Sequence, residues 1–293
     1  MSELPLVSVI AVCYNHAKYV VETLDSIKAQ TYPNIELVIM DDCSTDNSAE
    51  VIQEWIDRNT YQCQFIAHKE NEGLCRTLNE ALNLTKGEYY QGLACDDIIH
   101  KDKLNRQVEI FNSYPSVSLV HSSANKIDEN GKTIIKGFNL NKKNKIGVQD
   151  NHLDMMISMV EGNIVIAPSV LIKVSSLPTE PVYSEKYFFE DLYLNMRLLF
   201  NKNDFFFINI PLVNYRVLKD SMVRSKKHKN VLQIDRCKIL LEFIGCNDLI
   251  DKAIIKKTNK LISFKNHIDG RLSVDNYFYL VILKLRSYLK KYV

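Results

Sequence analysis

Strand and helix signals alternate along the first 113 residues, and this alternation constrains the fold more than any other feature of the sequence. Short apolar, β-branched runs predict buried strands at 7–15, 35–42, 63–69 and 88–97. Apolar residues at helical spacing predict helices after each of them, at 19–30, 44–59, 71–89 and 101–113. A βαβ alternation builds a mostly parallel sheet with helices on both faces. The sequence therefore predicts an α/β fold.

A few residues indicate where these helices begin and end. Asp46 or Asn47 is the expected N-cap of the second helix, because a short polar side chain there can accept a hydrogen bond from the first turn. Gly87 is expected to close the third helix, because glycine tolerates the left-handed conformation that ends many helices.

Three of the predicted strands end in polar pairs, namely Tyr14-Asn15, Asp41-Asp42 and Asp96-Asp97. The C-terminal ends of parallel strands lie at one edge of the sheet, and open α/β sheets bind their ligands outside that edge. We therefore expect the functional site there.

Asp96 and Asp97 are adjacent carboxylates at the end of a buried strand. They repel each other unless a cation or hydrogen-bond donors compensate. Mg²⁺ and Mn²⁺ suit such a pair, because they take carboxylate oxygens and complete their shell with water and phosphate oxygens. The alternative is a solvated turn in which one aspartate caps the helix that begins near Lys101.

The alternation loosens beyond Pro115. The remaining signals predict a strand at 117–128, a hairpin turn at 128–133, a helix at 151–160, a strand at 164–173, a helix at 189–200, a strand at 204–216 and a helical tail at about 230–293.

Composition narrows the class of protein. The chain has 293 residues, 46% apolar and 25% charged, which is typical of a globular protein. A net charge of +2 is too balanced for non-specific nucleic-acid binding, so no nucleic-acid partner is expected. The seven cysteines are scattered without a CxxC pair, which favours reduced thiols and a cytoplasmic location. We see no signal peptide and no run of the ~20 apolar residues that spanning a bilayer requires.

The motifs in their order resemble one family. "VSVIAVCYN", "MDDCSTDNS", "NEGLCRTLNEALNLTKGEY" and "CDD" together are similar to the nucleotide-binding half of the family-2 glycosyltransferases. The resemblance is close over about 6–130 and weaker to about 225. It implies a GT-A fold (a Rossmann-like sheet covered by helices, with a C-terminal helical extension) and a nucleoside diphosphate sugar as donor. It divides the chain into a GT-A domain, 1–225, with nucleotide-binding (1–115) and acceptor-binding (116–225) halves, and a helical region, 226–293.

The resemblance assigns donor-binding roles to the first two strand ends. The main chain of Val12 and the side chains of Tyr14 and Asn15 would lie beside the nucleobase. Asp42 would accept a hydrogen bond from the imide N–H of the base, which suits uracil and thymine. Arg76 would reach the nucleotide, the alternative being an ordinary surface arginine.

Asp96 and Asp97 match the D-x-D-like element of the family. By resemblance, Asp96 contacts the ribose and Asp97 holds Mn²⁺ or Mg²⁺ on the diphosphate. Negative charge develops on the diphosphate as the sugar–phosphate bond breaks, and a cation held there stabilises it.

The acceptor hydroxyl needs a base in the transition state. Glu190 and Asp191 begin a predicted helix, where acids also favour the helix dipole without any catalytic role. The resemblance makes Asp191 the base of an inverting displacement and places Glu190 at the acceptor.

The sequence departs from the family at two elements. In "YRVLKDSMV" Leu218 occupies the position of a histidine that can approach the diphosphate in relatives. Either Lys219, Arg224 or Lys226 neutralises the diphosphate in its place, or these residues form a solvated basic loop. A Gln-x-x-Arg-Trp motif of processive relatives is absent, because the only tryptophan is Trp55. We therefore expect the transfer of one sugar per acceptor.

The tail "NYFYLVILKLRSYLKKYV" combines apolar residues with lysine and arginine. Such a helix either lies on an anionic membrane surface or packs on the catalytic domain. Family analogy favours a polyprenyl-diphosphate-linked glycan as acceptor, as in O-antigen or capsule synthesis. No sequence feature sets an oligomeric state.

Other protein classes fit less well. Nucleotidyltransferases and dinucleotide-dependent oxidoreductases need a glycine-rich turn after the first strand, and no glycine precedes Gly73. A non-catalytic sugar-nucleotide-binding protein with the same fold stays open as the alternative.

Overall fold

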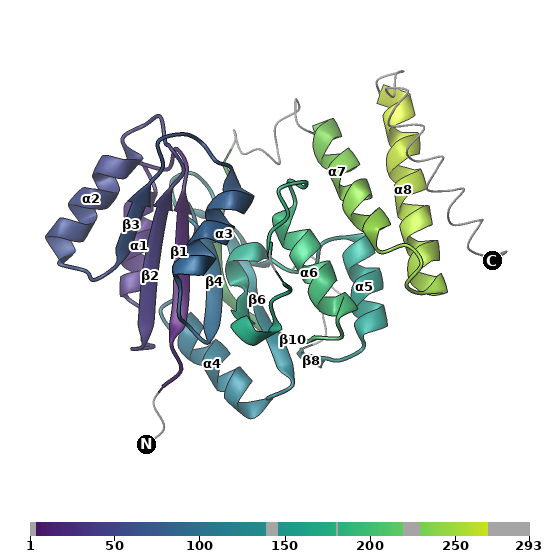
Figure 1. The fold of residues 1–293 in the computed structure, drawn as a ribbon, viewed down its shortest axis with the longest axis horizontal. Coiled ribbons are helices and arrows are strands. Elements are labelled where there is room, and N and C mark those ends of the chain that lie inside the picture. The colour runs from purple at the N-terminus through teal and green to yellow at the C-terminus, as the bar shows by residue number, and fades with distance from the viewer. Residues whose placement is uncertain (1–3, 139–145, 180, 219–228, 269–293) are drawn as a thin grey trace.

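The structure is a computed structural model that describes residues 4–138, 146–179, 181–218 and 229–268 (Figure 1). A ten-stranded sheet lies at its centre, in the order β3-β2-β1-β4-β9-β6-β10-β5, with β7 beside β6 and β8 beside β10. The strands are β1 (Val7–Cys13), β2 (Ile35–Asp41), β3 (Gln64–Ala67), β4 (Tyr89–Ala94), β5 (Ile98–Ile99), β6 (Val117–Ile127), β7 (Thr133–Phe138), β8 (Gly147–Gln149), β9 (Leu171–Lys173) and β10 (Asp204–Arg216). The α-helices are α1 (Val20–Lys28), α2 (Ser48–Asn59), α3 (Leu74–Leu84), α4 (Lys103–Ser113), α5 (His152–Glu161), α6 (Glu190–Phe200), α7 (Lys229–Glu242) and α8 (Asp248–Ile268).

The first four long strands form the parallel half of the sheet. β1 pairs in parallel with both β2 and β4, and β2 pairs in parallel with β3. Helices α1, α2 and α3 connect these strands and lie within the predicted ranges 19–30, 44–59 and 71–89. The predicted α/β organisation of this half is confirmed.

The second half of the sheet is more mixed than the sequence predicts. β9 runs antiparallel to both β4 and β6, while β6 and β10 are parallel. The predicted hairpin turn is present, because β7 folds back antiparallel on β6. Gly131 in this turn has φ +79°, a conformation that glycine adopts without strain.

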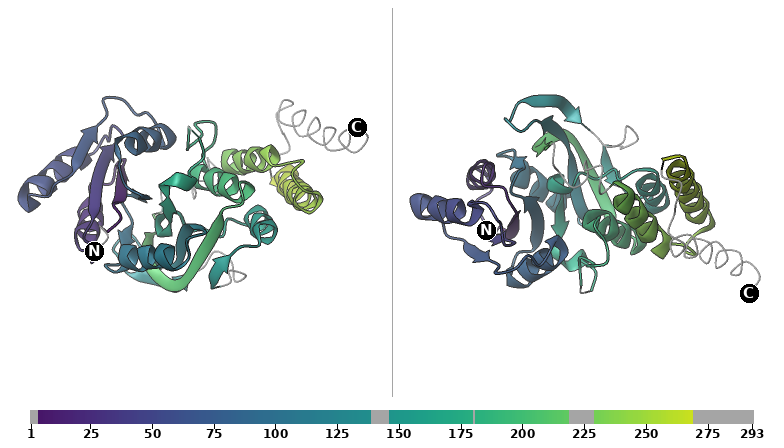
Figure 2. Two further views of the ribbon diagram at one scale, coloured as in Figure 1. Left: turned by 60° about the horizontal axis from the view of Figure 1, so that its bottom comes forward. Right: turned by 90° about the horizontal axis from the view of Figure 1, so that it is seen from above.

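The alternation of β1 side chains divides the apolar core between two faces of the sheet. Val9 and Ala11 belong to one cluster with apolar residues of α1, α2 and α4. Ile10 and Val12 point to the opposite face, where α3 and the helices α5 to α8 pack. Figure 2 shows these two helical layers with the sheet between them. Every side chain of β1 is buried as a result, as the continuous apolar run predicts.

Gly87 does not close the third helix, so that prediction is wrong. α3 ends at Leu84, and its C-cap residue Thr85 is extended. Gly87 instead lies against the start of β1, where its N–H donates to Ser8 Oγ at 2.9 Å. A Cβ on Gly87 would lie 2.2 Å from Ser8 Oγ and 2.7 Å from the Ser8 nitrogen. Close packing, not helix capping, therefore requires glycine here.

Two other elements differ from the predictions, whereas the N-cap position of α2 is one of the two predicted. The strand expected at 164–173 is reduced to β9, because Pro168 lies in a 3₁₀ turn over 167–169 and lacks a ladder N–H. Asn47 occupies the N-cap position of α2, yet the side chain of Asp46 is the one that accepts from Ser48 N. The predicted tail is helical in α7 and α8, with residues 243–247 between them, and the basic tail at 276–293 lies outside the described residues.

Candidate functional site

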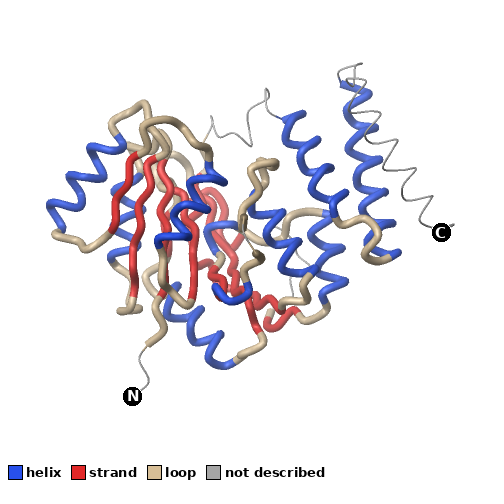
Figure 3. Tube along the Cα trace, viewed as in Figure 1, coloured by secondary structure: helices blue, strands red, loops and turns tan. Residues whose placement is uncertain are grey.

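The three polar strand ends are adjacent because β1 lies between β2 and β4. Cys13 pairs with Asp41 and Val12 pairs with Ala94, so the three strands end at nearly the same level. Backbone bonds continue past the strands, from Asp42 N to Cys13 O and from Cys95 N to Val12 O, both at 2.9 Å. The loops that follow gather at this edge (Figure 3). The structure thus brings together the donor-side residues that the sequence singled out at 12–15, 42 and 96–97.

Asn15 organises the loop after β2 rather than pointing freely outward. Its φ of +58° is in the left-handed region, which asparagine tolerates better than most residues. Its side-chain oxygen accepts from the N–H of Thr45 at 2.7 Å and of Asp46 at 3.3 Å. Tyr14 is 45% exposed beside it, while Val12 is buried and offers only its main chain. An aromatic ring is therefore available at the rim for a flat ligand.

Asp42 is the most heavily hydrogen-bonded of the predicted donor-binding residues. It is 3% exposed. Its carboxylate accepts from the N–H groups of Glu72 at 2.8 Å and Gly73 at 2.9 Å, and it lies 3.0 Å from His68 Nδ1. Asn71 donates to its backbone carbonyl. Asp42 therefore fixes the "NEG" loop that leads into α3.

Arg216, at the end of β10, holds the Asp96-Asp97 turn in place. Its backbone N–H donates to Asp97 Oδ1 at 2.8 Å, and its Nε donates to the carbonyl of Asp96 at 2.8 Å. Its guanidinium also pairs with Glu22 of α1. The residue is 3% exposed. The sequence showed Arg216 only as part of a motif, and the contact to the acidic pair is 120 residues distant along the chain.

The acidic pair is electrostatically unfavourable without a further cation. Burial, and then the neighbouring Asp96 charge, raise the pKa of Asp97 well above its ordinary value. Burial also raises the pKa of Asp96, although His16, whose Nε2 lies 4.0 Å from Asp96 Oδ2, opposes this. Asp96 is the more accessible of the two, since its side chain is 17% exposed.

The donor set fits a hard divalent cation. Two carboxylates are enough, because Mg²⁺ and Mn²⁺ usually take one or two from the protein and the rest from water and phosphate. Within the described ranges, no cluster of three or more His, Cys, Asp or Glu side chains is arranged to hold a metal. Any ion at this turn therefore depends on the ligand for the remainder of its coordination shell.

Arg76 is exposed on the first turn of α3 and is engaged by two carboxylates. Its guanidinium pairs with Glu72 and lies 3.3 Å from Glu185. A guanidinium has five N–H donors, so a phosphate at Arg76 would share it with these two carboxylates. The contact to Glu185 ties α3 to the segment that leads into α6.

Glu190 and Asp191 begin α6, as predicted, and both are partly buried. Burial and the Asp191 charge raise the pKa of Glu190 to about 8. Burial also raises the pKa of Asp191, while hydrogen bonds from Asn163 (2.7 Å) and Leu192 N (2.7 Å) oppose the shift. A carboxylate with a raised pKa accepts a proton more readily, which is what a general base requires.

α7 contributes a second layer to this site that the sequence analysis missed. Asp235 accepts from the N–H groups of Phe188 at 2.8 Å and Phe189 at 3.2 Å, just before α6. Tyr187 donates its hydroxyl to Glu242 at 2.6 Å. The Arg236 charge lowers the pKa of Asp191 against the effect of burial. The only signal in the sequence was the adjacent pair Asp235 and Arg236 on the otherwise apolar face of α7.

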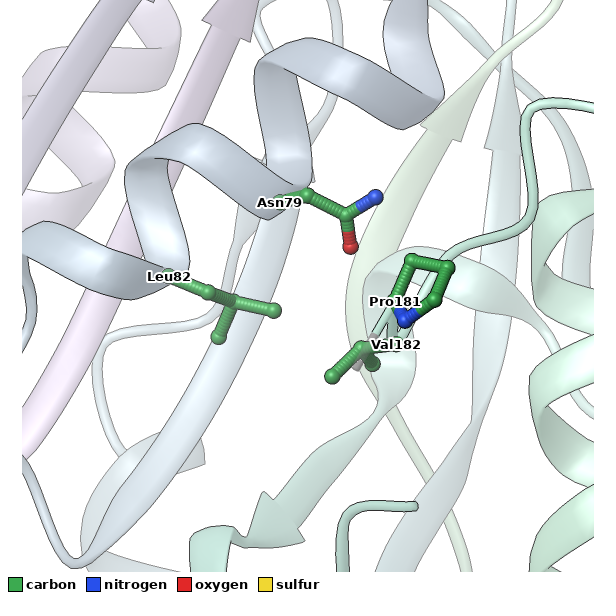
Figure 4. A pocket seen from close by; sticks show the side chains of 4 residues that line it. All are labelled: Asn79, Leu82, Pro181 and Val182. Atoms are coloured by element: carbon green, nitrogen blue, oxygen red, sulfur yellow. The ribbon is translucent and has the colours of Figure 1, made fainter. Parts of the chain in front are cut away.

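The N-terminus of α3 connects Asp42 to the segment that leads into α6. Gly73 N donates to Asp42 on one side, and Cys75 Sγ contacts the carbonyl of Tyr187 at 3.6 Å on the other. Farther along α3, Asn79 exchanges two hydrogen bonds with the backbone of Tyr183. A pocket of about 270 Å³ opens there, lined by Asn79, Leu82, Pro181 and Val182 (Figure 4). Its lining includes none of the predicted site residues.

Lys219, Arg224 and Lys226, considered above as substitutes for the missing histidine, lie outside the described residues. Leu218 is described and partly buried. No helix in the described ranges is long and apolar enough to cross a membrane.

The sheet order and the acidic turn after β4 define an α/β protein of the GT-A class. Residues 8–161, more than half of the chain, match the family model described as glycosyl transferase family 2. The chain therefore belongs to the family-2 glycosyltransferases. The resemblance inferred from the motifs and the expected fold class, including C-terminal helices, are both confirmed.

Relatives and solved structures agree with this assignment. An uncharacterized glycosyltransferase of Rickettsia felis is 34% identical over 170 residues, which are 56% of this chain and 27% of that protein. The putative teichuronic acid biosynthesis glycosyltransferase TuaG of Bacillus subtilis is 36% identical over 107 residues, 36% of this chain and 42% of that protein. The chain thus spans less than half the length of these two curated relatives.

The fold is shared with more distant structures. The crystal structure of S. aureus TarS 1–349 matches with a TM-score of 0.64 at 19% identity. The match covers 92% of this chain and 75% of the TarS chain. The mannosyltransferase PcManGT of Pyrobaculum calidifontis has a TM-score of 0.60 at 16% identity, with coverages of 99% and 85%. At these identities the likeness concerns the fold.

Proposed function

We propose that this protein is an inverting, divalent-metal-dependent glycosyltransferase that moves one sugar from a nucleotide-sugar to an acceptor hydroxyl. A UDP-sugar is the favoured donor, and a dTDP-sugar presents the same base edge to Asp42. The observation that carries the proposal is that, in a family-2 chain, the N-terminus of α3 is bound by Asp42 of the donor edge on one side and contacts Tyr187, just before Glu190-Asp191, on the other.

The roles of the residues follow from their chemistry. Tyr14 and Asn15 lie at the rim where the base would enter, and Asp42 would accept its imide N–H. Asp96 would contact the ribose and Asp97, whose carboxylate also accepts from Arg216 N, would hold the cation. Mn²⁺ or Mg²⁺ would supply positive charge to the leaving diphosphate. Arg76 would reach the nucleotide through N–H donors that Glu72 and Glu185 do not take.

On the acceptor side, Asp191 would take the proton of the attacking hydroxyl and Glu190 would contact the acceptor sugar. A direct displacement by that hydroxyl inverts the anomeric centre and requires no enzyme nucleophile. Solved relatives are consistent with such a donor: TarS has been crystallised with UDP and with UDP-GlcNAc, and PcManGT with GDP-Man and Mn²⁺.

We further propose a GT-A domain at 1–225 and a helical region at 226–293, working at the cytoplasmic face of a membrane. The acceptor would be a glycan, and a polyprenyl-diphosphate-linked oligosaccharide of surface polysaccharide synthesis fits the basic, apolar tail. The name of TuaG is consistent with a glycan acceptor.

Two measurements test the proposal. A thermal-shift panel of UDP-, GDP- and dTDP-sugars, with and without Mn²⁺, should show metal-dependent stabilisation by one of them, because a ligand that binds only the native state raises its stability. Asp191→Asn should then keep this stabilisation but lose at least about 100-fold in donor turnover. Stabilisation without any turnover by the wild-type protein would favour the non-catalytic alternative, and no stabilisation by any nucleotide would refute the donor site.

A further inference from the structure

His68 lies beside Asp42 because the sheet places it there. β2 and β3 are parallel, and Asp41 pairs with Ala67 at their ends. The backbone N–H of His68 then donates to the carbonyl of Asp41 at 2.8 Å. His68 and Asp42 are therefore each the first residue beyond a pair of neighbouring strands, at the edge where the donor is proposed to bind.

The imidazole of His68 bridges two carboxylates. Its Nδ1 lies 3.0 Å from Asp42 Oδ1, and its Nε2 lies 3.2 Å from Glu80 Oε2 on α3. The ring is 9% exposed, whereas Glu80 is 46% exposed. Ionised carboxylates only accept hydrogen bonds, so both ring nitrogens must donate to satisfy this arrangement. With both carboxylates ionised, this geometry favours the doubly protonated, positively charged imidazolium.

His68 also completes the set of donors around the Asp42 carboxylate. A carboxylate has about four acceptor positions. The N–H of Glu72 and His68 Nδ1 take those of Oδ1, and the N–H of Gly73 takes one on Oδ2. Among the hydrogen bonds of the described residues, one position on Oδ2 is left. A base N–H would bind to this position.

We propose that His68 is a positioning residue for donor recognition, whose imidazolium bridge from Glu80 to Asp42 orients the Asp42 carboxylate toward the base of a nucleoside diphosphate. This inference rests on the proposed function of Asp42. The ring itself does not touch the donor, and its effect passes through Asp42.

The charges around the ring agree with this role. The groups that act on it are the carboxylates of Asp42, at the end of β2, and Glu80, on α3. Arg76, the cation on the same helix, is paired with Glu72 and Glu185. Burial alone would lower the pKa of His68, but the hydrogen bond to Asp42 and the charge of Glu80 outweigh burial and raise it above 6.5. Both hydrogen bonds of the bridge are therefore present below pH 6.5, the ordinary pKa of histidine. They are lost as the pH rises through the raised pKa of His68 in the native protein.

Binding of UDP in the presence of Mn²⁺, measured by titration calorimetry, tests the role. His68→Ala should raise the Kd for UDP about tenfold, since it removes a hydrogen bond to a charged, buried carboxylate. His68→Asn keeps a donor at the position of Nδ1 and should lose only about threefold. The wild-type Kd should rise as the pH rises through the raised pKa of His68, and the Kd of His68→Asn should not. Circular dichroism checks that the variants are folded.

Nuclear magnetic resonance of the imidazole provides a readout independent of UDP. In the wild-type protein His68 should titrate above pH 6.5. Glu80→Gln should lower this pKa, because it removes one of the two acceptor charges. Glu70→Gln is the matched control, since it removes the same charge from an exposed glutamate close by in the sequence, and it should leave the titration unchanged.

The outcomes separate this inference from the proposed function. A wild-type protein that binds UDP, with His68→Ala binding equally well, would refute the role of His68 and leave the donor site standing. Failure of the wild-type protein to bind UDP or any other nucleotide would refute the donor site and this role together. A His68 ring that titrates at or below 6.5 would refute the bridging imidazolium.

Discussion

His121 should make the protein acid-sensitive by an amount that the structure sets. The side chain is fully buried on β6, with its ring 5.0 Å from Phe207. Nε2 lies 3.0 Å from Gln149 Oε1, and Nδ1 has no hydrogen-bond partner among the described residues. Burial lowers the pKa of His121 from 6.5 to about 4, although the bond to Gln149 opposes this. The ring is therefore neutral in the native protein at neutral pH.

The sign of the effect follows from proton binding in the two states. Between pH 6.5 and 4 the unfolded chain protonates His121 and the native protein does not, so the free energy of unfolding falls as the pH falls. With these two pKa values the loss between pH 7.5 and 5.0 is about 2 kcal/mol, approaching about 3.4 kcal/mol below pH 4.

Urea unfolding at pH 7.5 and pH 5.0 measures this loss. His121→Gln keeps an N–H donor for Gln149 but cannot be protonated, so its free energy of unfolding should fall by about 2 kcal/mol less than that of the wild-type protein over this range. His100→Gln replaces a half-exposed histidine and serves as the control, with a wild-type pH dependence. Equal losses in the wild-type protein and His121→Gln, within about 0.5 kcal/mol, would refute the reasoning.

Two further changes test the packing and the α7 contact. Gly87→Ala should destabilise the protein by about 1–3 kcal/mol, because the new Cβ meets the backbone of Ser8. Gly162→Ala is the control and should be close to neutral, since its Cβ meets nothing within 4 Å. Thermal unfolding compares the two variants, and equal melting temperatures would contradict the close approach. Asp235→Ala should lower the free energy of unfolding by about 1.5–3 kcal/mol, since it leaves the N–H groups of Phe188 and Phe189 without their charged acceptor. Lys256→Gln, on the exposed face of α8, should lower it by less than about 0.5 kcal/mol. Chemical denaturation measures both, and similar values for the two variants would argue against the contact.

Apolar periodicity and the polar residues at strand ends are local features of the sequence. The sequence alone therefore determined the strands, the helices and the edge of the sheet that depend on them. The apolar runs of β1, β2 and β4 read directly as buried strands, and the connecting helices follow from their spacing. Parallel pairing then requires the polar ends of these strands to share one edge. The donor side of the site was therefore predictable as a group, and so was the acidic start of α6.

Contacts between distant segments required the tertiary structure. Asp235 meets Phe188 across 47 positions, Arg216 meets Asp97 across 119, and His68 meets Asp42 across 26. None of these residues carries a local pattern that names its partner, because a single polar residue on a helix or after a strand fits solvent equally well. Gly87 shows the same limit, since only the approach of β1 reveals why a Cβ cannot be present. The sequence thus determined which carboxylates gather, and only the packing of the helices and strands decided which donors orient them.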